Sequence, residues 1–360
     1  MLDALDPHVL TPDVWEQLFE IFETHYSADL PFLHKTTFLE PVRRPSMPPP
    51  GGVLASAKNA RPPGPEEFLL AFLALTARFH PAIVAHHSPS TASRPSNPLI
   101  ASEYYATAAN ERLLSVDAEP QITKLESVQA ALMLGLHEWG MCRGYRAWIR
   151  VGMATRAAQA MGLQYEKDLD DEPNSRSMAL DVEAKRMGLA NDRKPSMSFS
   201  AMASDDNPFV EQEIRRRTFW SCYVMDRYMS SGKYRPQMLH ARELRIQLPA
   251  SERTFLFGNK VRTMLLEEHG AGRVSDRQAS LVPGIHKEST AVPSPNSING
   301  HEDDDQETWE TGVQEGLVSR YMRILEIYGR VVQWSCAGGR RYAYSSSSLR
   351  QLSRANMEVL

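Results

Sequence analysis

Cysteine is scarce in this sequence. Its 360 residues include three cysteines, Cys142, Cys222 and Cys336, and no two of them form a Cys-x-x-Cys pair. Without such a pair, the sequence supports neither a thiol redox motif nor a structural zinc site made mainly of cysteine. An odd, scattered set of cysteines fits reduced thiols inside a cell better than the disulfide framework of a secreted protein.

Long apolar runs are also missing. No stretch approaches the ~18 continuous apolar residues that predict a transmembrane helix, and the first residues, MLDALDP, lack the apolar segment of a signal peptide. The formal net charge of −4 argues against a surface that is basic overall and binds phosphate. We therefore expect a chain without membrane contact that is long enough to bury a core.

The familiar catalytic and metal-binding motifs are absent as well. His137-Glu138 begins like the H-E-x-x-H helix of zinc proteases, but Met141 stands where the second histidine is required. His86-His87 has no third ligand near it and predicts a solvated surface. The sequence holds no complete dinucleotide loop, no G-x-S-x-G elbow and no Walker loop. We predict no catalytic residue, no metal site and no cofactor, and hence a protein that is not an enzyme.

Helical periodicity dominates what is present. Apolar residues recur at spacings of three and four, which is typical of helices that bury one face, and no period-2 alternation is sustained enough for a sheet. The sequence therefore predicts an all-α fold with many helices joined by long loops. Helices are expected over residues 11–26, 66–79, 100–114, 123–139, 143–162, 209–231 and 315–336, with a short one within 178–189.

Proline, glycine and serine separate these helices. Stretches rich in them predict loops, and an acidic, serine- and proline-rich stretch near the C-terminus predicts disorder, because it has little apolar surface to offset the entropy of ordering. The expected organisation is a tail at 1–13, a helical domain at 14–270 with proline-rich loops at 41–65 and 86–98 and a polar loop at 168–206, a disordered insert at 271–308, a final helix of the domain at 309–336 and a tail at 337–360.

In the helix expected from Ile214 to Met229, the second half, Thr218 to Met225, is apolar almost all round, which predicts a helix enclosed by neighbours. Asp226 and Arg227 interrupt it, and an unpaired buried charge costs several kcal/mol. A buried structural ion pair is the simpler interpretation, and a catalytic or ligand site is the alternative. Arg215-Arg216-Arg217 opens the same helix and could be a localisation signal or a phosphate contact. Glu211 and Glu213 lie three or four residues before it, and this spacing favours ion pairs along the helix surface.

The helix around Trp148 follows a different pattern. Its small side chains predict a close approach to another helix at the centre of a bundle. These residues are Gly144, Ala147, Val151, Gly152, Ala154, Thr155, Ala158 and Gly162.

Read together, five segments resemble one family, the fungal-specific transcription factor domain. This is the middle homology region of zinc-cluster regulators of the xylanolytic-regulator type. The segments are HYSADLPFLHKTTF at 25–38, the helix at 144–163, EIRRRTFW at 213–220 with Asp226-Arg227, Arg235-Pro236, and LPASERTF at 248–255.

The resemblance implies an all-α regulatory domain of a nuclear protein. Its partners would be the transcription machinery or co-regulator proteins, with a homodimer and a small-molecule effector left open. The candidate residues of the family motifs, either structural or lining an effector pocket, are Pro31, Phe32, His34, Trp148, Arg217, Trp220, Asp226, Arg227, Arg235 and Pro236.

The chain departs from the family at its DNA-binding module. Full-length members carry an N-terminal cluster of six cysteines that holds two zinc ions and places a helix in the major groove, whereas this sequence has three scattered cysteines. We therefore expect zinc only in such full-length members, no DNA-binding residue here, and DNA contact only through a missing N-terminal module. The chain is then either a regulatory fragment or a natural member without the cluster.

Two other functions compete with transcription regulation through protein contacts. One is a small-molecule sensor whose pocket lies between the helices of Trp148 and Trp220, because apolar gaps between helices are common ligand sites. The other is a helical enzyme that uses Asp226 and Arg227, since buried charges sometimes mark active sites.

Overall fold

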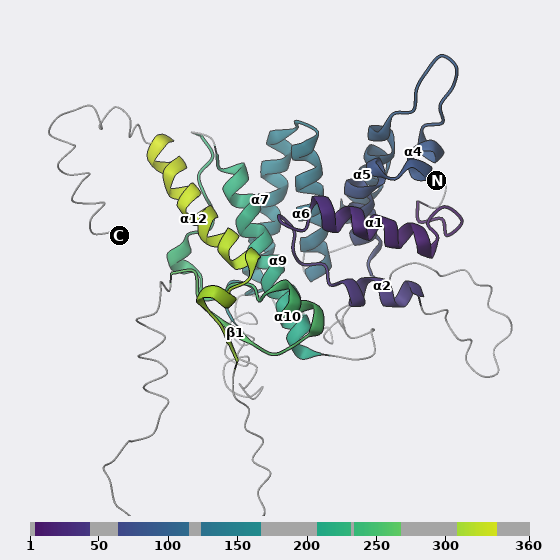
Figure 1. Cartoon of the computed structure of the whole chain (residues 1–360). Helices are drawn as coiled ribbons and strands as arrows, with labels where there is room; N and C mark the ends of the chain where they lie inside the picture. The colour runs from purple at the N-terminus through teal and green to yellow at the C-terminus, as the bar shows by residue number, and fades with distance from the viewer. Residues whose placement is uncertain are drawn as a thin grey trace, which may run out of the picture.

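The computed structural model of the chain describes residues 4–43, 64–114, 124–166, 207–231, 234–267 and 308–336. Over these ranges the fold is mostly helical, which confirms the predicted class (Figure 1). Several predicted segments lie outside the described residues. They are positions 44–63 of the first proline-rich loop, the loop at 168–206 with its candidate helix at 178–189, the insert at 271–307 and the tail at 337–360.

The first helix confirms its predicted boundaries and its buried face. Helix α1 spans Pro12–His25, and the Thr11 hydroxyl caps it by accepting a hydrogen bond from the Val14 amide at 3.4 Å. Its buried aromatic and aliphatic residues meet Phe38 and Phe72 in one cluster of rings. The buried residues of α1 are Trp15, Leu18, Phe19 and Phe22.

Helix α3, Glu66–Thr76, is the core helix of this half of the molecule. Every residue from Phe68 to Thr76 is buried, because α5 (Pro98–Leu114), α6 (Leu125–Gly140) and α1 all pack against it. The prediction of one apolar stripe ending at Phe79 is therefore wrong. The chain turns into a 3₁₀ helix at Ala77–Phe79, where Phe79 is 44% exposed and stacks on His25.

Helices α6 and α7 form an antiparallel hairpin at the centre. Helix α7 spans Gly144–Ala160 and, as its small residues predict, packs closely on its neighbours. The closest approach is at Gly135 of α6, where a β-carbon would lie 2.8 Å from a Val151 methyl group. Helix α9, Pro208–Met229, lies against both α6 and α7, and the Asn207 side chain caps it.

The last helix lies along one flank of the molecule, opposite α4 and α5 (Figure 1). Helix α12 spans Leu317–Cys336 and packs on α9. The helix predicted at 315–336 is confirmed to within two residues, and the first part of the segment at 309–336 forms β2 (Trp309–Glu310) and a 3₁₀ turn (Gly312–Gln314). Strand β2 pairs in parallel with β1 (Arg262–Thr263), a two-residue contact that no alternation could predict.

Three short helices of the described residues were not predicted from the sequence. They are α2 (Lys35–Arg43), α4 (Pro81–His87) and α10 (Glu252–Phe257). Helix α2 continues through Pro41, and α4 contains His86 and His87, so both proline-rich loops were predicted to begin too early. The His87 imidazole contacts the Tyr105 hydroxyl at 3.0 Å instead of facing solvent alone. A further 3₁₀ turn spans Ala241–Glu243.

Among the described helices, no single one is long and apolar enough to cross a membrane. The pair formed by Glu66–Phe79 and Pro81–His87 passes the same test of length and composition together, although it is bent by 100°. The first member of that pair is the enclosed core helix α3.

Candidate functional site

Helix α9 carries two clusters of buried charge, one near each end. The first surrounds Glu213 and is called here the Glu213 cluster; the second surrounds Asp226 and is called the Asp226 cluster. Between them the helix is apolar and completely enclosed, as its sequence predicts. The predicted site residues fall into these two clusters or at their margins.

Glu213 is the centre of the first cluster. Its side chain is completely buried, and one carboxylate oxygen accepts hydrogen bonds from Arg217 Nε at 2.8 Å and from the Ala250 amide at 2.9 Å. The other oxygen binds Arg216. The ion pairs predicted from the i+3 and i+4 spacing are confirmed, but the predicted surface position is wrong, since Arg216 and Arg217 are only 3% and 2% exposed.

Glu166 completes the charge balance of this cluster. Its carboxylate lies 2.6 Å from Arg216 Nη2 and also accepts the Gln247 amide at 3.0 Å. Two guanidinium groups therefore face two carboxylates at the start of α9. The hydrogen bonds between these four groups offset the cost of burying their charges, since an unpaired buried charge would be costly.

Arg217 joins three segments that are far apart in the sequence. Its guanidinium donates to the Pro31 carbonyl at 3.2 Å and to the Ala250 carbonyl at 2.7 Å. The same group lies over the Phe255 ring, with 4.1 Å between its central carbon and the ring centroid. Arg217, on α9, thus connects the PFLH segment (residues 31–34) to the LPASERTF segment (residues 248–255).

His34 secures the PFLH segment from the other side. Its Nδ1 accepts the Thr37 amide at 3.3 Å, which caps α2, and its Nε2 lies 3.3 Å from the Leu256 carbonyl. With Nδ1 accepting, Nε2 carries the proton that it donates, so the ring is neutral in this arrangement. Burial lowers the pKa of His34, with a smaller contribution from the nearby positive charge of Arg217.

Two aromatic candidates are core residues beside this cluster. Trp220 is fully buried, and its indole Nε1 donates to the Gln247 carbonyl at 2.8 Å. Phe32 is 1% exposed and belongs to the same hydrophobic core. Both residues fix segments in place, and neither ring is open to a ligand.

Asp226 anchors the second cluster. Its carboxylate accepts the amides of Met238 and Leu239, each at 3.1 Å, and lies 3.0 Å from Arg227 Nη1. Burial raises the pKa of Asp226, and the two backbone amides and Arg227 oppose that shift. A carboxylate enclosed in this way holds the chain that follows α9 and has no space for a substrate.

Arg227 extends the second cluster to α12. Its guanidinium lies 4.1 Å over the Tyr223 ring, donates to the Leu239 carbonyl at 2.9 Å and lies 3.5 Å from a Glu326 oxygen. The Tyr223 hydroxyl donates to the same oxygen at 2.5 Å. The pair predicted at Asp226 and Arg227 is therefore a structural ion pair that links three segments.

The remaining candidates lie at the margins. Arg235 is half-buried, and its guanidinium lies about 3.6 Å from where a Gly144 side chain would begin. Pro236 is exposed, and its carbonyl accepts the Ser230 hydroxyl at 3.2 Å. Trp148 is half-buried against the core. The structure does not bring these three residues together with the PFLH segment.

A pocket was predicted at the interface between α7 and α9. Thr155 of α7 lies beside Cys222 of α9, and both side chains are completely buried. Burial also raises the pKa of the Cys222 thiol, so it behaves as a small apolar residue.

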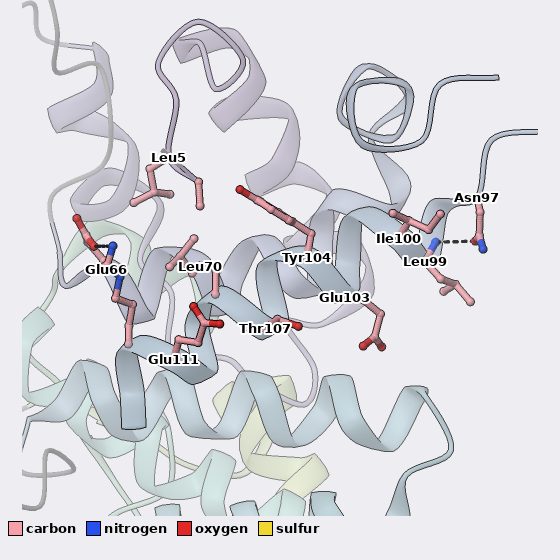
Figure 2. A pocket seen from close by; sticks show the side chains of 13 residues that line it. Leu5, Glu66, Leu70, Asn97, Leu99, Ile100, Glu103, Tyr104, Thr107 and Glu111 are labelled. Carbon is pink, nitrogen blue, oxygen red and sulfur yellow. Dashed lines mark hydrogen bonds and ion pairs between the residues drawn. The ribbon is translucent and has the colours of Figure 1, made fainter. Parts of the chain in front are cut away.

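A hollow of about 740 Å³ lies elsewhere, between residues 4–5, α3 and α5 (Figure 2). Leu5 and Leu70 contribute apolar walls, and Tyr104, Thr107 and Glu111 line it along α5. Its volume lies within the ~300–1,000 Å³ typical of ligand pockets. This hollow was not predictable from the sequence, because its walls come from three separate segments.

Sequence reasoning also missed the partners that come from distant segments. Glu166, Gln247 and Glu326 carry no local signal of their roles, because they meet α9 only after folding. Glu213 was identifiable by its helical spacing to the arginines.

Comparison with known proteins places the chain among transcription regulators. The model of the family described as "Fungal specific transcription factor domain" matches residues 15–306. A Zn(2)-C6 fungal-type transcription factor of Fusarium oxysporum f. sp. lycopersici is 29% identical over 71% of this chain and 22% of its own length. Two uncharacterized transcriptional regulatory proteins of Schizosaccharomyces pombe are 28% and 29% identical, each over 76% of this chain, and over 23% and 31% of their own lengths.

The chain thus spans about a quarter of the length of these relatives. No solved structure matches it.

Proposed function

The chain belongs to the fungal specific transcription factor domain family, and we propose that it regulates transcription through protein contacts, without reading DNA itself. The family and the named relatives show the role in transcription regulation. The mode of action is our proposal. The observation that carries it is that Arg217, Asp226 and Arg227, three charged residues of the family motifs, are buried and hold other segments of the fold.

The two clusters of α9 support a non-enzymatic role. Asp226 and Arg227 are 3% and 2% exposed. The Asp226 carboxylate accepts backbone amides, and the two Nη atoms of Arg227 bind Asp226, the Leu239 carbonyl and Glu326. A catalytic acid or base needs to reach the atom that it protonates or deprotonates. A pair sealed in this way holds α9, the segment at 236–239 and α12 together.

The zinc cluster of the family does not fit the residues of this chain. Six thiolates hold two zinc ions in that module, and this sequence has three cysteines. Cys222 is completely buried in α9, and its thiol pKa is raised, which disfavours the thiolate that zinc requires. We therefore propose that zinc and direct DNA contact belong to other parts of full-length proteins.

The proposed setting is the nucleus, with co-regulators or the transcription machinery as partners. The relatives' names support it, since they describe transcription factors and transcriptional regulatory proteins.

A tethering experiment tests the proposal. The chain is fused to an unrelated DNA-binding module, and transcription from a reporter with that module's site is compared with the module alone. The fusion is expected to change transcription, while the unfused chain gives no sequence-specific footprint with or without zinc. An unchanged reporter would overturn the regulatory role, and a sequence-specific footprint would overturn the claim that the chain does not read DNA.

The hollow beside α5 supports a second candidate function, a small-molecule sensor. Its apolar walls and the carboxylate of Glu111 favour an apolar amine as ligand, since the other two carboxylates of the lining, Glu103 and Glu66, are paired with Arg143 and Arg112. Amines from a screening panel are then expected to raise the melting temperature of the chain. Ala108→Trp, which fills the hollow, should remove the effect, and Ala85→Trp on the exposed face of α4 should not. A panel without response, or a response unchanged by Ala108→Trp, would count against this function.

A further inference from the structure

Helix α12 has two apolar faces, and the fold uses only one. The inner face packs against α9 and the segment at 248–250, and the hydroxyl of Ser319 donates to the Pro249 carbonyl. Gly329 on this face touches Arg227 so closely that a β-carbon there would lie 2.9 Å from its side chain. The buried residues of α12 are Val318, Ser319, Met322, Leu325 and Gly329.

The outer face of α12 is exposed and follows a regular spacing. Its residues are separated by alternating steps of three and four, which is the seam of a helix that packs against another helix along its length. Five of the six positions are apolar. The seam consists of Leu317 (76% exposed), Arg320, Ile324 (61%), Ile327 (55%), Val331 (57%) and Trp334 (43%).

Such a seam differs from scattered surface residues. Single exposed apolar side chains are common and need no explanation, whereas a contiguous row of large ones marks a contact surface. A second exposed row on α7, Tyr145, Ile149 and Met153, has steps of four only and drifts around its helix. It lacks the alternation of a helix-packing seam and provides a comparison for experiments.

The charges beside the seam are positive. Arg323 and Arg330 lie on the same edge of it, and Arg320 lies within it. Glu326, the only carboxylate of α12, points inward to Tyr223 and Arg227. A partner helix on this face therefore meets guanidinium groups and no carboxylate from α12.

We propose that the outer face of α12 binds an amphipathic helix of a partner protein, with apolar residues in its seam and acidic residues along its edges. This deepens the proposed function, on which it rests, by naming the chemistry of one regulatory partner. Apolar burial along the seam supplies affinity. Arg323 is already paired with Glu315 at 2.8 Å, so the partner's carboxylates supply orientation and discrimination mainly through Arg320 and Arg330.

A second copy of this chain fits the face less well. If two α12 helices met antiparallel, the edge with Arg323 and Arg330 would face the same edge of the other copy, and like charges would oppose each other. In a parallel pair, these arginines would face Tyr328 and Ser335, which offer no opposite charge. The charges therefore select a helix with acidic edges.

A pair of designed peptides tests this proposal. Both are about three heptads long with leucine in the seam, and the edges carry glutamate in one and lysine in the other. Fluorescence anisotropy against the full chain is expected to show the glutamate peptide binding at least about tenfold more tightly than the lysine peptide. Ile327→Glu should weaken binding of the glutamate peptide by about tenfold or more, and Arg330→Glu should reduce the preference between the peptides.

Ile149→Glu on α7 is the matched control, because it places the same charge on an exposed isoleucine outside the seam. It should leave peptide binding unchanged, and circular dichroism checks that each variant is folded. Equal binding of both peptides, or binding unaffected by Ile327→Glu, would overturn the proposal. So would a chain that is dimeric in sedimentation and becomes monomeric with Ile327→Glu, since the seam would then be a self-interface. If the tethered chain does not change reporter transcription but still binds the peptide, the result counts against the proposed function alone.

Discussion

Single residues on α9 combine partners that the chain separates widely. Glu213 lies in one helix with Arg216 and Arg217, but it also accepts a backbone amide from Ala250. Removing one member of such a buried group leaves the others charged and without a partner, which costs more than the original pairing contributes. The energetic effect of a substitution therefore depends on burial and not on the number of ion pairs.

The contrast between two carboxylates near Arg217 makes this testable. Glu213→Gln should lower the free energy of unfolding by about 3–5 kcal/mol, because buried Arg217 loses its close counter-charge and buried Arg216 keeps only Glu166. Glu252→Gln should change it by less than about 0.5 kcal/mol, since Glu252 is 56% exposed and 3.9 Å from Arg217. Urea denaturation of both variants measures the difference. Equal losses would contradict the buried-charge explanation.

His34 adds a dependence on pH at the residue scale. Burial lowers its pKa from the ordinary 6.5, so the unfolded chain binds a proton at a pH where the folded chain does not. This part of the stability is present above about pH 6.5 and is lost as the pH falls through the folded pKa. His34→Asn keeps a side chain that can cap α2 but removes the titrating group.

The expected result is that the wild-type chain loses more stability than His34→Asn between about pH 7.5 and pH 5.5. Chemical denaturation at both pH values measures it. His80, His87 and His137 also have lowered pKa values, but they are common to both proteins and cancel in the comparison. If the difference in unfolding free energy between wild type and His34→Asn does not change with pH, the proposed role of His34 is contradicted.

At the scale of helices, the long elements could be predicted and the short ones could not. The long helices have several turns of apolar periodicity, which identifies them without knowledge of their neighbours. Helices α2 and α4 are short, and a histidine caps each, since the Ile83 amide bonds to His80 as the Thr37 amide bonds to His34. Histidine is not a usual capping signal, although Pro81 after His80 is a typical helix start.

The packing of α12 on α9 gives a prediction at the same scale. Gly329→Ala adds a methyl group 2.9 Å from Arg227 and Gln237, and it should destabilise the chain by about 1–3 kcal/mol through overpacking. Gly152→Ala is the control, because its methyl group would lie at an ordinary 3.6 Å from Met238. This control should gain up to about 1 kcal/mol from helix propensity. Thermal and urea unfolding compare the two, and a stabilising Gly329→Ala would contradict the close contact.

For the whole molecule, the sequence predicts the class and the composition of the core, but not the long-range pairing. The burial of Asp226 and Arg227 followed from the apolar residues around them, and their pairing followed from the cost of isolated charge. The connections of Arg217 to Pro31 and Ala250 join positions 186 and 33 residues apart. Such contacts depend on how the helices pack, and periodicity within one helix carries no information about them.

In the whole molecule, the buried clusters hold together the fold on which the proposed regulation by protein contacts depends. The family-motif residues hold the PFLH segment, the LPASERTF segment and α12 around α9. Under the proposed function, partners bind surfaces outside these clusters, and the clusters hold those surfaces in position. The loss of a cluster should therefore abolish regulation even though no partner touches it.

The most direct test measures reporter transcription with the chain tethered as wild type, as Glu213→Gln and as Glu252→Gln. The account predicts that wild type and Glu252→Gln change transcription equally, while Glu213→Gln falls to the level of the DNA-binding module alone. Equal regulation by Glu213→Gln and wild type, or no effect of any of the three, would contradict it.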